Sequence, residues 1–259
     1  MEGVELLFLG TGTSAGVPMI GCRCEVCTST DPRDKRTRPS VVISYGSTRV
    51  LVDATPELRL QCVANVVDRI DALVFTHGHA DHIMGLDDVR RFNHVKGGPL
   101  DVWADPRTHR ILQRCFGYAF CEPAPEMKVF RPHLVPRAIE GPFEIAGVRW
   151  TPVPLWHGDM PVLGFRVGRL AYCTDVSRIP DESFALLEGL DVLVLDALQY
   201  KPHVTHFNVE QAINAGRRIG ARETRFTHIA HALGHEQTNA KLPERMRLAF
   251  DGERVTARL

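Results

Sequence analysis

Residues 76–82 of the chain read THGHADH and follow the strand-like run DALVF. His77, His79, Asp81 and His82 fall within six positions, with glycine and alanine as the only spacers. A loop between a strand and a helix can aim all of these side chains into one pocket, whereas a helix would send them to different faces. Lone histidines are usually structural, but this density of ligand-type residues predicts a metal site.

The sequence on either side of this turn is typical of a layered α/β protein. Short apolar, β-branched runs of strand length recur between glycines and charged residues, and several end directly in a polar residue. Candidate helices lie between them, over residues 56–66, 85–93, 107–116, 180–190, 208–219 and 242–250. The order of strands and helices predicts mixed sheets rather than a simple parallel doubly wound fold.

Length and charge narrow the class of protein. The chain has 259 residues, of which 44% are hydrophobic, so we expect one domain over residues 1–259. Lysine plus arginine equals aspartate plus glutamate at 31 each, which gives no general attraction to nucleic acid or to anionic membranes. Residues 28–39, TSTDPRDKRTRP, are basic and contain two prolines, and we expect a solvated loop there.

The N-terminus and the cysteines predict a cytoplasmic protein. MEGVELLFLGTG lacks the basic start and the longer apolar run of a secretory signal, and no stretch approaches the roughly 20 apolar residues of a membrane span. Seven cysteines is an odd number, and a chain of this size does not need disulfides. Reduced thiols, some of them bound to metal, fit these observations better than the disulfide framework of a secreted protein.

HGHADH resembles the HxHxDH motif of the metallo-β-lactamase-fold hydrolases. This resemblance implies an αββα sandwich of two mixed sheets flanked by helices, with a one- or two-metal site along one edge. It also implies a histidine after a later strand, a bridging aspartate after the next hairpin and a histidine near the C-terminus. The sequence supplies these as His157, Asp175 and His228.

The implied ligands divide between two metals, with His77, His79 and His157 on the first, Asp81, His82 and His228 on the second, and Asp175 bridging both. Two divalent ions about 3.5 to 4 Å apart turn a bridging water into hydroxide at neutral pH and neutralise charge on a phosphoryl oxygen. Mixed imidazole and carboxylate ligands suit zinc or manganese.

The resemblance narrows to the cyclic phosphodiesterase of the carbon–phosphorus lyase pathway and its relatives. It is carried by LFLGTGTSAGVPMIGCRCEVC, SVVI, LVDATPELR and THIAHA, from about Leu7 to about His231. In that group a CxCxxC motif and a C-terminal histidine bind a structural zinc. The matching Cys₃His set is Cys22, Cys24, Cys27 and His231, which would staple a loop at about residues 20–39.

A general acid must protonate the leaving oxygen, and relatives carry a histidine where His206 stands. His203 is a rival three positions away, and histidine suits the role because its ordinary pKa lies near working pH. Asp53 and Asp196 end strand-like runs; they either orient ligand histidines or accept ordinary backbone hydrogen bonds. The glycines of LGTGTSAG could free backbone N–H groups to hold a phosphate.

Together these observations predict a metal-dependent phosphodiesterase in which Asp175 and His206 are catalytic. A dimetal-bridging hydroxide would attack a small, cyclic or nucleotide-like phosphodiester. The alternatives are an RNA-end-processing nuclease, supported only by the basic cluster at residues 33–38, a protein related to pyrroloquinoline quinone synthesis, and a metal-binding module without catalysis. The expected partner is the small substrate, without nucleic acid or membrane, and the resemblance also implies a homodimer.

Overall fold

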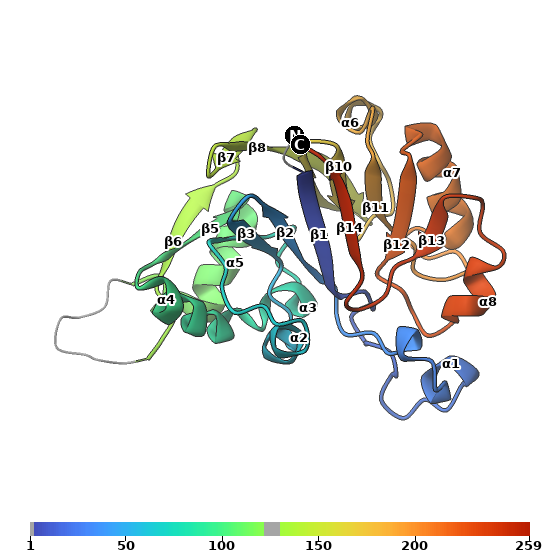
Figure 1. Cartoon of the computed structure of the whole chain (residues 1–259), viewed down its shortest axis with the longest axis horizontal. Helices are drawn as coiled ribbons and strands as arrows, with labels where there is room; N and C mark the ends of the chain where they lie inside the picture. The colour runs from blue at the N-terminus through green and yellow to red at the C-terminus, as the bar shows by residue number, and fades with distance from the viewer. Residues whose placement is uncertain (1–2, 122–129) are drawn as a thin grey trace.

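Two seven-stranded sheets face each other in the computed structural model, which describes residues 3–121 and 130–259 (Figure 1). The first sheet has the order β14-β1-β2-β3-β4-β5-β6 and the second the order β13-β12-β11-β10-β9-β8-β7. The strands are β1 (Gly3–Gly10), β2 (Ser40–Tyr45), β3 (Thr48–Val52), β4 (Ala72–Val74), β5 (Leu100–Ala104), β6 (Leu134–Ala138), β7 (Phe143–Ile145), β8 (Val148–His157), β9 (Met160–Val167), β10 (Leu170–Cys173), β11 (Val192–Asp196), β12 (Glu223–Thr227), β13 (Met246–Leu248) and β14 (Arg254–Arg258).

Both sheets are mixed. Strands β3 to β6 run parallel in the first sheet, whereas β14, β1, β2 and β3 pair antiparallel. Strands β10 to β13 run parallel in the second sheet, whereas β7 to β10 pair antiparallel. The predicted sandwich of two mixed sheets is confirmed.

Helices cover the outer face of each sheet and complete four layers (Figure 1). The first sheet carries α2 (Leu58–Ala64), α3 (Ala80–Ile83), α4 (Arg90–Lys96) and α5 (Pro106–Phe116), together with the 3-10 turns η2 (Leu86–Val89) and η3 (Gly117–Ala119). The second carries α6 (Asp181–Leu186), α7 (Val209–Ile219) and α8 (His235–Asn239). The loop after β1 holds α1 (Glu25–Thr28) and η1 (Pro32–Asp34). No helix among residues 3–121 and 130–259 is long and apolar enough to cross a membrane.

The sequence of β1 explains how one strand serves two layers. Val4, Leu6 and Phe8 belong to the core between the sheets, whereas Leu7 and Leu9 pack under the helices of the first sheet. Alternate residues of a strand point to opposite faces, so a continuous apolar run is expected where both faces are covered.

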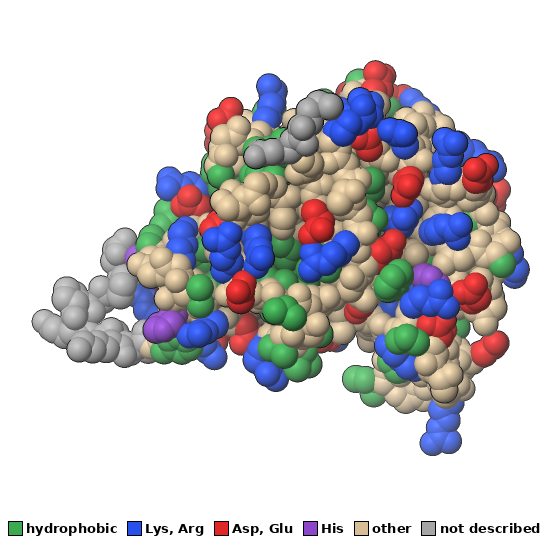
Figure 2. All heavy atoms as spheres, viewed as in Figure 1, with side chains coloured by type: hydrophobic (Ala, Val, Ile, Leu, Met, Phe, Trp, Pro, Cys, Tyr) green, Lys and Arg blue, Asp and Glu red, His purple; other side chains and the backbone are tan. Residues whose placement is uncertain are grey.

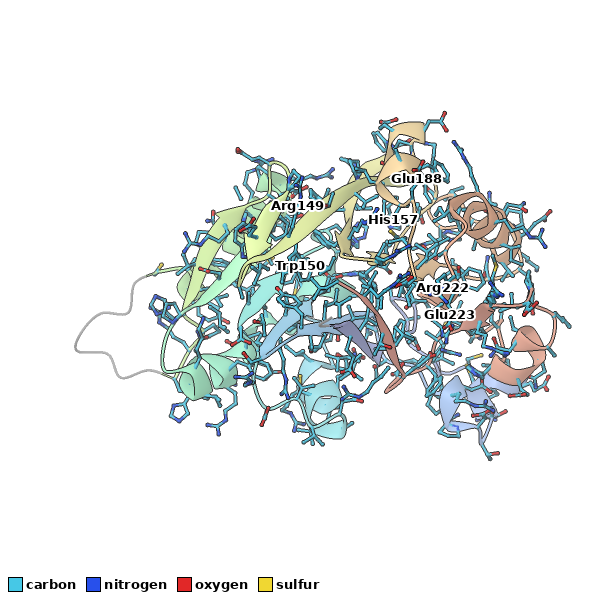
Figure 3. All side chains as sticks on the ribbon, turned by 45° about the horizontal axis from the view of Figure 1, so that its top comes forward. Arg149, Trp150, His157, Glu188, Arg222 and Glu223 are labelled. Atoms are coloured by element: carbon cyan, nitrogen blue, oxygen red, sulfur yellow. The ribbon has the colours of Figure 1, made fainter. Side chains whose placement is uncertain are left out.

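Trp150 anchors strand β8 in the core between the sheets, where it is fully buried. Its indole N–H donates to the Tyr45 hydroxyl at 3.1 Å, and that hydroxyl donates to the carbonyl of Ile145 at 3.0 Å. A buried tryptophan needs such a partner for its polar atom. Figure 3 shows His157 further along the same ribbon, at the end of β8 away from Arg149 and Trp150.

The helix expected over residues 242–250 is wrong. Strand β13 occupies this region and pairs parallel with β12 through Met246 and Leu248. These two side chains are buried and Arg247 between them is exposed, which is the two-residue period of a strand. Pro243 also breaks a helix at this point, and the helix that does form, α8, lies earlier in the chain.

The expectation of a solvated loop at residues 28–39 is also wrong in its second half. Arg36 is 2% exposed, and its guanidinium donates to the Thr11 hydroxyl at 2.9 Å and to the carbonyl of Ala249. The buried carboxylate of Asp34 accepts the backbone N–H of His235 at 2.8 Å. This stretch is therefore an anchored part of the fold.

The glycines of LGTGTSAG allow close packing of neighbouring segments, and phosphate binding at this turn stays a prediction. The N–H groups of Thr11, Gly12, Thr13 and Gly16 donate to partners inside the protein. A side chain at Gly10 would place its Cβ 2.0 Å from the carbonyl oxygen of Arg38. Only glycine allows the two segments to approach so closely.

Candidate metal centre

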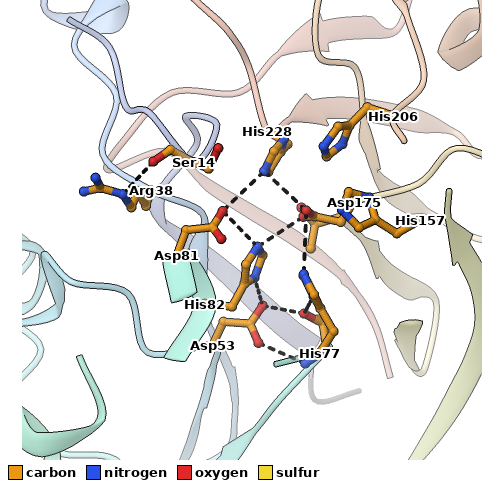
Figure 4. Close-up of polar contacts among 12 residues, drawn as sticks. Ser14, Arg38, Asp53, His77, Asp81, His82, His157, Asp175, His206 and His228 are labelled. Atoms are coloured by element: carbon orange, nitrogen blue, oxygen red, sulfur yellow. Dashed lines mark hydrogen bonds and ion pairs between the residues drawn. The ribbon is translucent and has the colours of Figure 1, made fainter. Parts of the chain in front are cut away.

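The predicted ligands converge at one edge of the sandwich, where strands of both sheets end (Figure 4). The turn with His77 and His79 follows β4 of the first sheet. The second sheet contributes His157 at the end of β8, Asp175 after β10 and His228 after β12. Side chains that follow strand ends of two facing sheets can meet only when the sandwich is closed.

Their donor atoms lie close enough to share metal ions. The following groups each have ligand atoms within 4.8 Å of one another: His77, His79 and His157; His77, His82 and Asp175; Asp81, His82 and His228; His157, Asp175 and His206. The first and third match the sets predicted for two metals. Asp175 is grouped with His77 and His157 of the first set and with His82 of the third. His206 also lies within ligand distance, which the sequence did not indicate.

Three residues of the site have a strained backbone. Asp53, Asp175 and His228 have φ angles of 63°, 57° and 59°, in the left-handed region that side chains other than glycine rarely adopt. Each such residue costs on the order of 1–3 kcal/mol and persists only where surrounding contacts hold it. Asp175 and His228 belong to the converged ligand groups, and Asp53 hydrogen-bonds to one of their members, His82.

Asp53 orients two of the candidate ligands. Its carboxylate accepts the Nδ1–H of His82 at 2.7 Å, and the N–H and hydroxyl of Thr76 at 2.9 and 2.8 Å. The Thr76 hydroxyl oxygen lies 3.0 Å from Nδ1 of His77 and accepts its proton. Both histidines therefore direct Nε2 into the site. Asp53 thus fulfils both interpretations left open above, as an acceptor from the backbone and as an orienting carboxylate.

A backbone carbonyl orients a third histidine in the same way. Nδ1 of His157 donates to the carbonyl of Thr205 at 2.8 Å, which leaves its Nε2 free. Histidine ligands of metals commonly donate their other ring N–H to a carboxylate or a carbonyl, which fixes the ring.

The inward atoms lack hydrogen-bond partners among the described residues, which fits a metal site. Within residues 3–121 and 130–259, Nε2 of His77, His82 and His228 is buried and makes no hydrogen bond. Nε2 of His82 lies 3.3 Å from one oxygen of Asp175, and Nε2 of His228 lies 3.4 Å from the other. Buried polar atoms are nearly always satisfied, so this cluster fits divalent cations held between imidazoles and carboxylates.

The pKa shifts of the buried ligands also favour bound cations. Burial lowers the pKa of His228, but the carboxylates of Asp175 and Asp81 outweigh it and raise that pKa to about 9. Burial raises the pKa of Asp175, but the imidazoles of His228 and His82 outweigh it and hold that pKa well below its ordinary value. Positive charge nearby therefore stabilises the Asp81 and Asp175 carboxylates, and bound cations would supply that charge.

His206 lies inside the site and His203 at its margin. Nδ1 of His206 is 2.6 Å from Asp196, which also accepts the N–H of Val176 at 2.7 Å. The His206 ring is 8% exposed, and its centroid lies 4.5 Å from that of His157 and 4.5 Å from that of His228. His203 is exposed, and its Nδ1 accepts the N–H of Thr205 at 3.3 Å.

The structure also brings Cys22, Cys24, Cys27 and His231 together, with ligand atoms within 4.8 Å of one another. Nδ1 of His231 lies 3.3 Å from Sγ of Cys22 and from Sγ of Cys24. Zinc bonds of about 2.3 Å to sulfur and 2.0–2.1 Å to nitrogen give a tetrahedral edge of roughly 3.5 Å, so this spacing fits zinc. The N–H of Cys27 and the ring of His231 lower the pKa of the Cys24 thiol to about 6.

Sequence reasoning missed two groups of residues near these sites. Arg107 and Asp159 line a cavity of about 400 Å³ together with His79 and His157, and no motif marks either of them. His235 and Arg36 form a buried pair, with Nδ1 of the imidazole 3.2 Å from the guanidinium. The fragment THIAHALGH shows His235 among other histidines, but nothing in it indicates this partner.

Comparison with known proteins agrees with the fold. The family model for the beta-lactamase superfamily domain matches residues 48–229. A solved structure described as a new diphosphatase from the PhnP family is 43% identical, with a TM-score of 0.92 over 99% of this chain and 98% of that one. Zinc-bound PqqB from Methylobacterium extorquens has a TM-score of 0.78 over 97% of this chain and 99% of its own, but at 21% identity it shows the fold alone.

A curated relative, an octanoyltransferase of Porphyromonas gingivalis, is 34% identical over 96% of this chain. The chain spans only 51% of that protein's length. Its name therefore describes a protein about twice as long, of which this chain resembles one half.

Proposed function

Because the chain belongs to the β-lactamase superfamily and has the metallo-β-lactamase fold, we propose that it is a metal-dependent phosphodiesterase acting on a small phosphodiester. The observation that carries the proposal is the placement of the His206–Asp196 pair beside the converged imidazoles and carboxylates. Such a site can hold cations against a phosphoryl group and has a proton donor for the alkoxide that leaves. The 43% identical diphosphatase supports chemistry at phosphorus.

The metals would be held as the groups of donor atoms suggest. His77, His79 and His157 would bind one cation, and Asp81, His82 and His228 the other. Asp175 would contact both. When bound, two divalent cations lower the pKa of a coordinated water and neutralise charge on the phosphoryl oxygens. Zinc and manganese both suit these ligands, and a separate structural zinc suits Cys22, Cys24, Cys27 and His231.

His206 would act as the general acid. Asp196 holds its Nδ1–H at 2.6 Å, so the proton on Nε2 is the one available to the leaving oxygen. The same carboxylate restricts the ring to one orientation. Among residues 3–121 and 130–259, His203 hydrogen-bonds to Thr205 and to no carboxylate, which favours His206 over its rival.

Hydrolysis of bis(p-nitrophenyl) phosphate compared with p-nitrophenyl phosphate tests the proposal, with the purified protein in added manganese or zinc. We expect faster turnover of the diester, and loss of bound metal and of activity together in Asp175→Ala. If the metal-loaded protein does not cleave the diester, the proposed function is wrong.

The nuclease alternative loses its support in the basic cluster at residues 33–38. Arg33 pairs with Asp31 at 2.7 Å, Arg36 is buried, and Arg38 pairs with Glu57. Figure 2 shows basic and acidic side chains interspersed over the face drawn. A surface that binds RNA along its length needs a continuous basic stripe. The single domain, the homodimer and the relation to cofactor synthesis stay predictions.

A further inference from the structure

We propose that Arg107 determines substrate specificity by binding a second phosphate joined to the one at the metal centre. The preferred substrates are then diesters of diphosphate. This inference rests on the proposed function and deepens it by naming the substrate class.

The position of Arg107 places a guanidinium group beside the site, in the cavity that also reaches His79 and His157. Arg107 is exposed near the start of α5 and lines the cavity of about 400 Å³ that also reaches His79 and His157. Asp81, His82 and His228 do not line this cavity. Arg107 therefore faces the side of the centre on which the first metal would lie. A cavity of this size accommodates a diphosphate with part of its substituent.

The packing of α5 fixes this position. A Cβ at Gly78, between His77 and His79, would lie 2.6 Å from Cδ1 of Ile111, so the helix rests directly on the ligand turn. Arg107 precedes Ile111 by four residues and lies on the same face of the helix, one turn nearer its start. The contact that seats α5 on the turn thus also brings Arg107 beside His79.

Arg107 is also free to bind a ligand. It makes no hydrogen bond or ion pair with any residue that the structure describes, and Asp159 lines the same cavity without pairing with it. Other arginines near the site are engaged: Arg38 pairs with Glu57, and Arg178 stacks over Trp156 at 4.8 Å. A guanidinium offers a planar set of donors that matches phosphate in a bidentate way.

A second phosphate explains the separation between the ligand cluster and Arg107. The phosphorus under attack must lie over the inward Nε2 atoms and His206, where cations and the proton donor act. A phosphate linked to it through one bridging oxygen would extend from the ligand cluster toward the exposed side of the cavity, where Arg107 lies. In the balanced reaction, R–O–PO₂⁻–O–PO₂⁻–O–R′ and water give ROPO₃H⁻ and R′OPO₃H⁻. The water oxygen bonds to one phosphorus, and the bridging oxygen leaves with the other.

The test uses two substrates that differ by one inserted phosphate, the p-nitrophenyl ester of thymidine 5′-monophosphate and that of thymidine 5′-diphosphate. We expect the wild-type protein to prefer the diphosphate ester in kcat/KM. Arg107→Gln should lower that preference by roughly 10- to 100-fold, mainly through KM, because it removes a charged hydrogen bond. Arg107→Lys should retain part of it, and raised salt should reduce the wild-type preference.

The matched control is Arg114→Gln, which removes the same charge from an exposed position about 10 Å further along α5. This variant should keep the wild-type preference. If Arg107→Gln leaves the preference unchanged, or Arg114→Gln lowers it equally, the role of Arg107 is refuted while the phosphodiesterase remains. If the metal-loaded wild type cleaves neither ester, the proposed function fails, and this inference falls with it.

Discussion

Replacing Asp53 tests whether the metal centre depends on the carboxylate beneath it. Asp53 is 1% exposed and accepts three hydrogen bonds, from the Nδ1–H of His82 and from the N–H and hydroxyl of Thr76. Asparagine has nearly the same shape and tolerates the left-handed backbone at φ 63°. Asp53→Asn therefore changes the charge and the acceptors while it leaves the backbone in place.

The structure sets the size of the effect. An asparagine whose oxygen faces His82 turns its NH₂ toward the N–H of Thr76, and the flipped amide turns its NH₂ toward His82. Either way at least one buried donor stays unpaired, which costs about 1–3 kcal/mol of unfolding free energy. The looser histidines should lower metal affinity by about 10- to 100-fold. Asp53→Ala frees all three donors and adds backbone strain, so it should lose more in both respects.

The assay is metal affinity by competition with a chelator, measured beside urea unfolding of the metal-free protein. Asp251→Asn is a matched control, because that carboxylate accepts hydrogen bonds from the N–H and hydroxyl groups of Thr11 and Thr37. It should lose comparable stability and keep its metal affinity. If Asp53→Asn binds metal as tightly as the wild type, or if Asp251→Asn loses equal affinity, Asp53 does not orient the ligands.

Three further predictions concern the other histidines and the cysteine loop. Cys24→Ser should lose one tightly held zinc and melt at a lower temperature. Equal zinc content in variant and wild type would exclude the structural zinc site. His206→Ala should keep its metals and lower kcat by roughly 10² to 10⁴, whereas a loss of rate in His203→Ala alone would reverse the assignment. Burial and the cation of Arg36 lower the pKa of His235 to about 4, so the unfolded chain binds more protons between that pH and about 6.5. The unfolding free energy, measured by urea titration at each pH, should therefore fall as pH drops through this window, by at most about 3 kcal/mol. His235→Gln should make this free energy less dependent on pH in the same window.

The ligand turn could be predicted because its information is local. Spacing in THGHADH already places His77 and His79 on one turn, and the strand-like runs before His157, Asp175 and His228 each end at the polar residue. Parallel strands bring such ends to one edge of a sheet. Convergence on one centre follows from the fold that the resemblance implies, and the structure brings these side chains together.

The remainder depends on contacts between distant segments. Arg36 and His235 are buried together, although the sequence around Arg36 has the composition of a solvated loop. Arg107 faces the cavity because Ile111 packs on Gly78, and neither spacing nor composition reveals that contact. Strand β13 forms by pairing with β12, which overrides the local preference of residues 242–250.

At the proposed metal site, cation binding and the closure of the sandwich would be one equilibrium. The first sheet supplies His77 and Asp81, and the second supplies His157, Asp175 and His228, so the complete set exists only in the folded protein. Folding without metal buries the Asp175 carboxylate against inward imidazoles and keeps three residues in left-handed strain. Because the unfolded chain has no such site, the free energy of metal binding adds to stability and offsets that strain. Strain at Asp53, Asp175 and His228 would thus be tolerated because the proposed metals compensate for it.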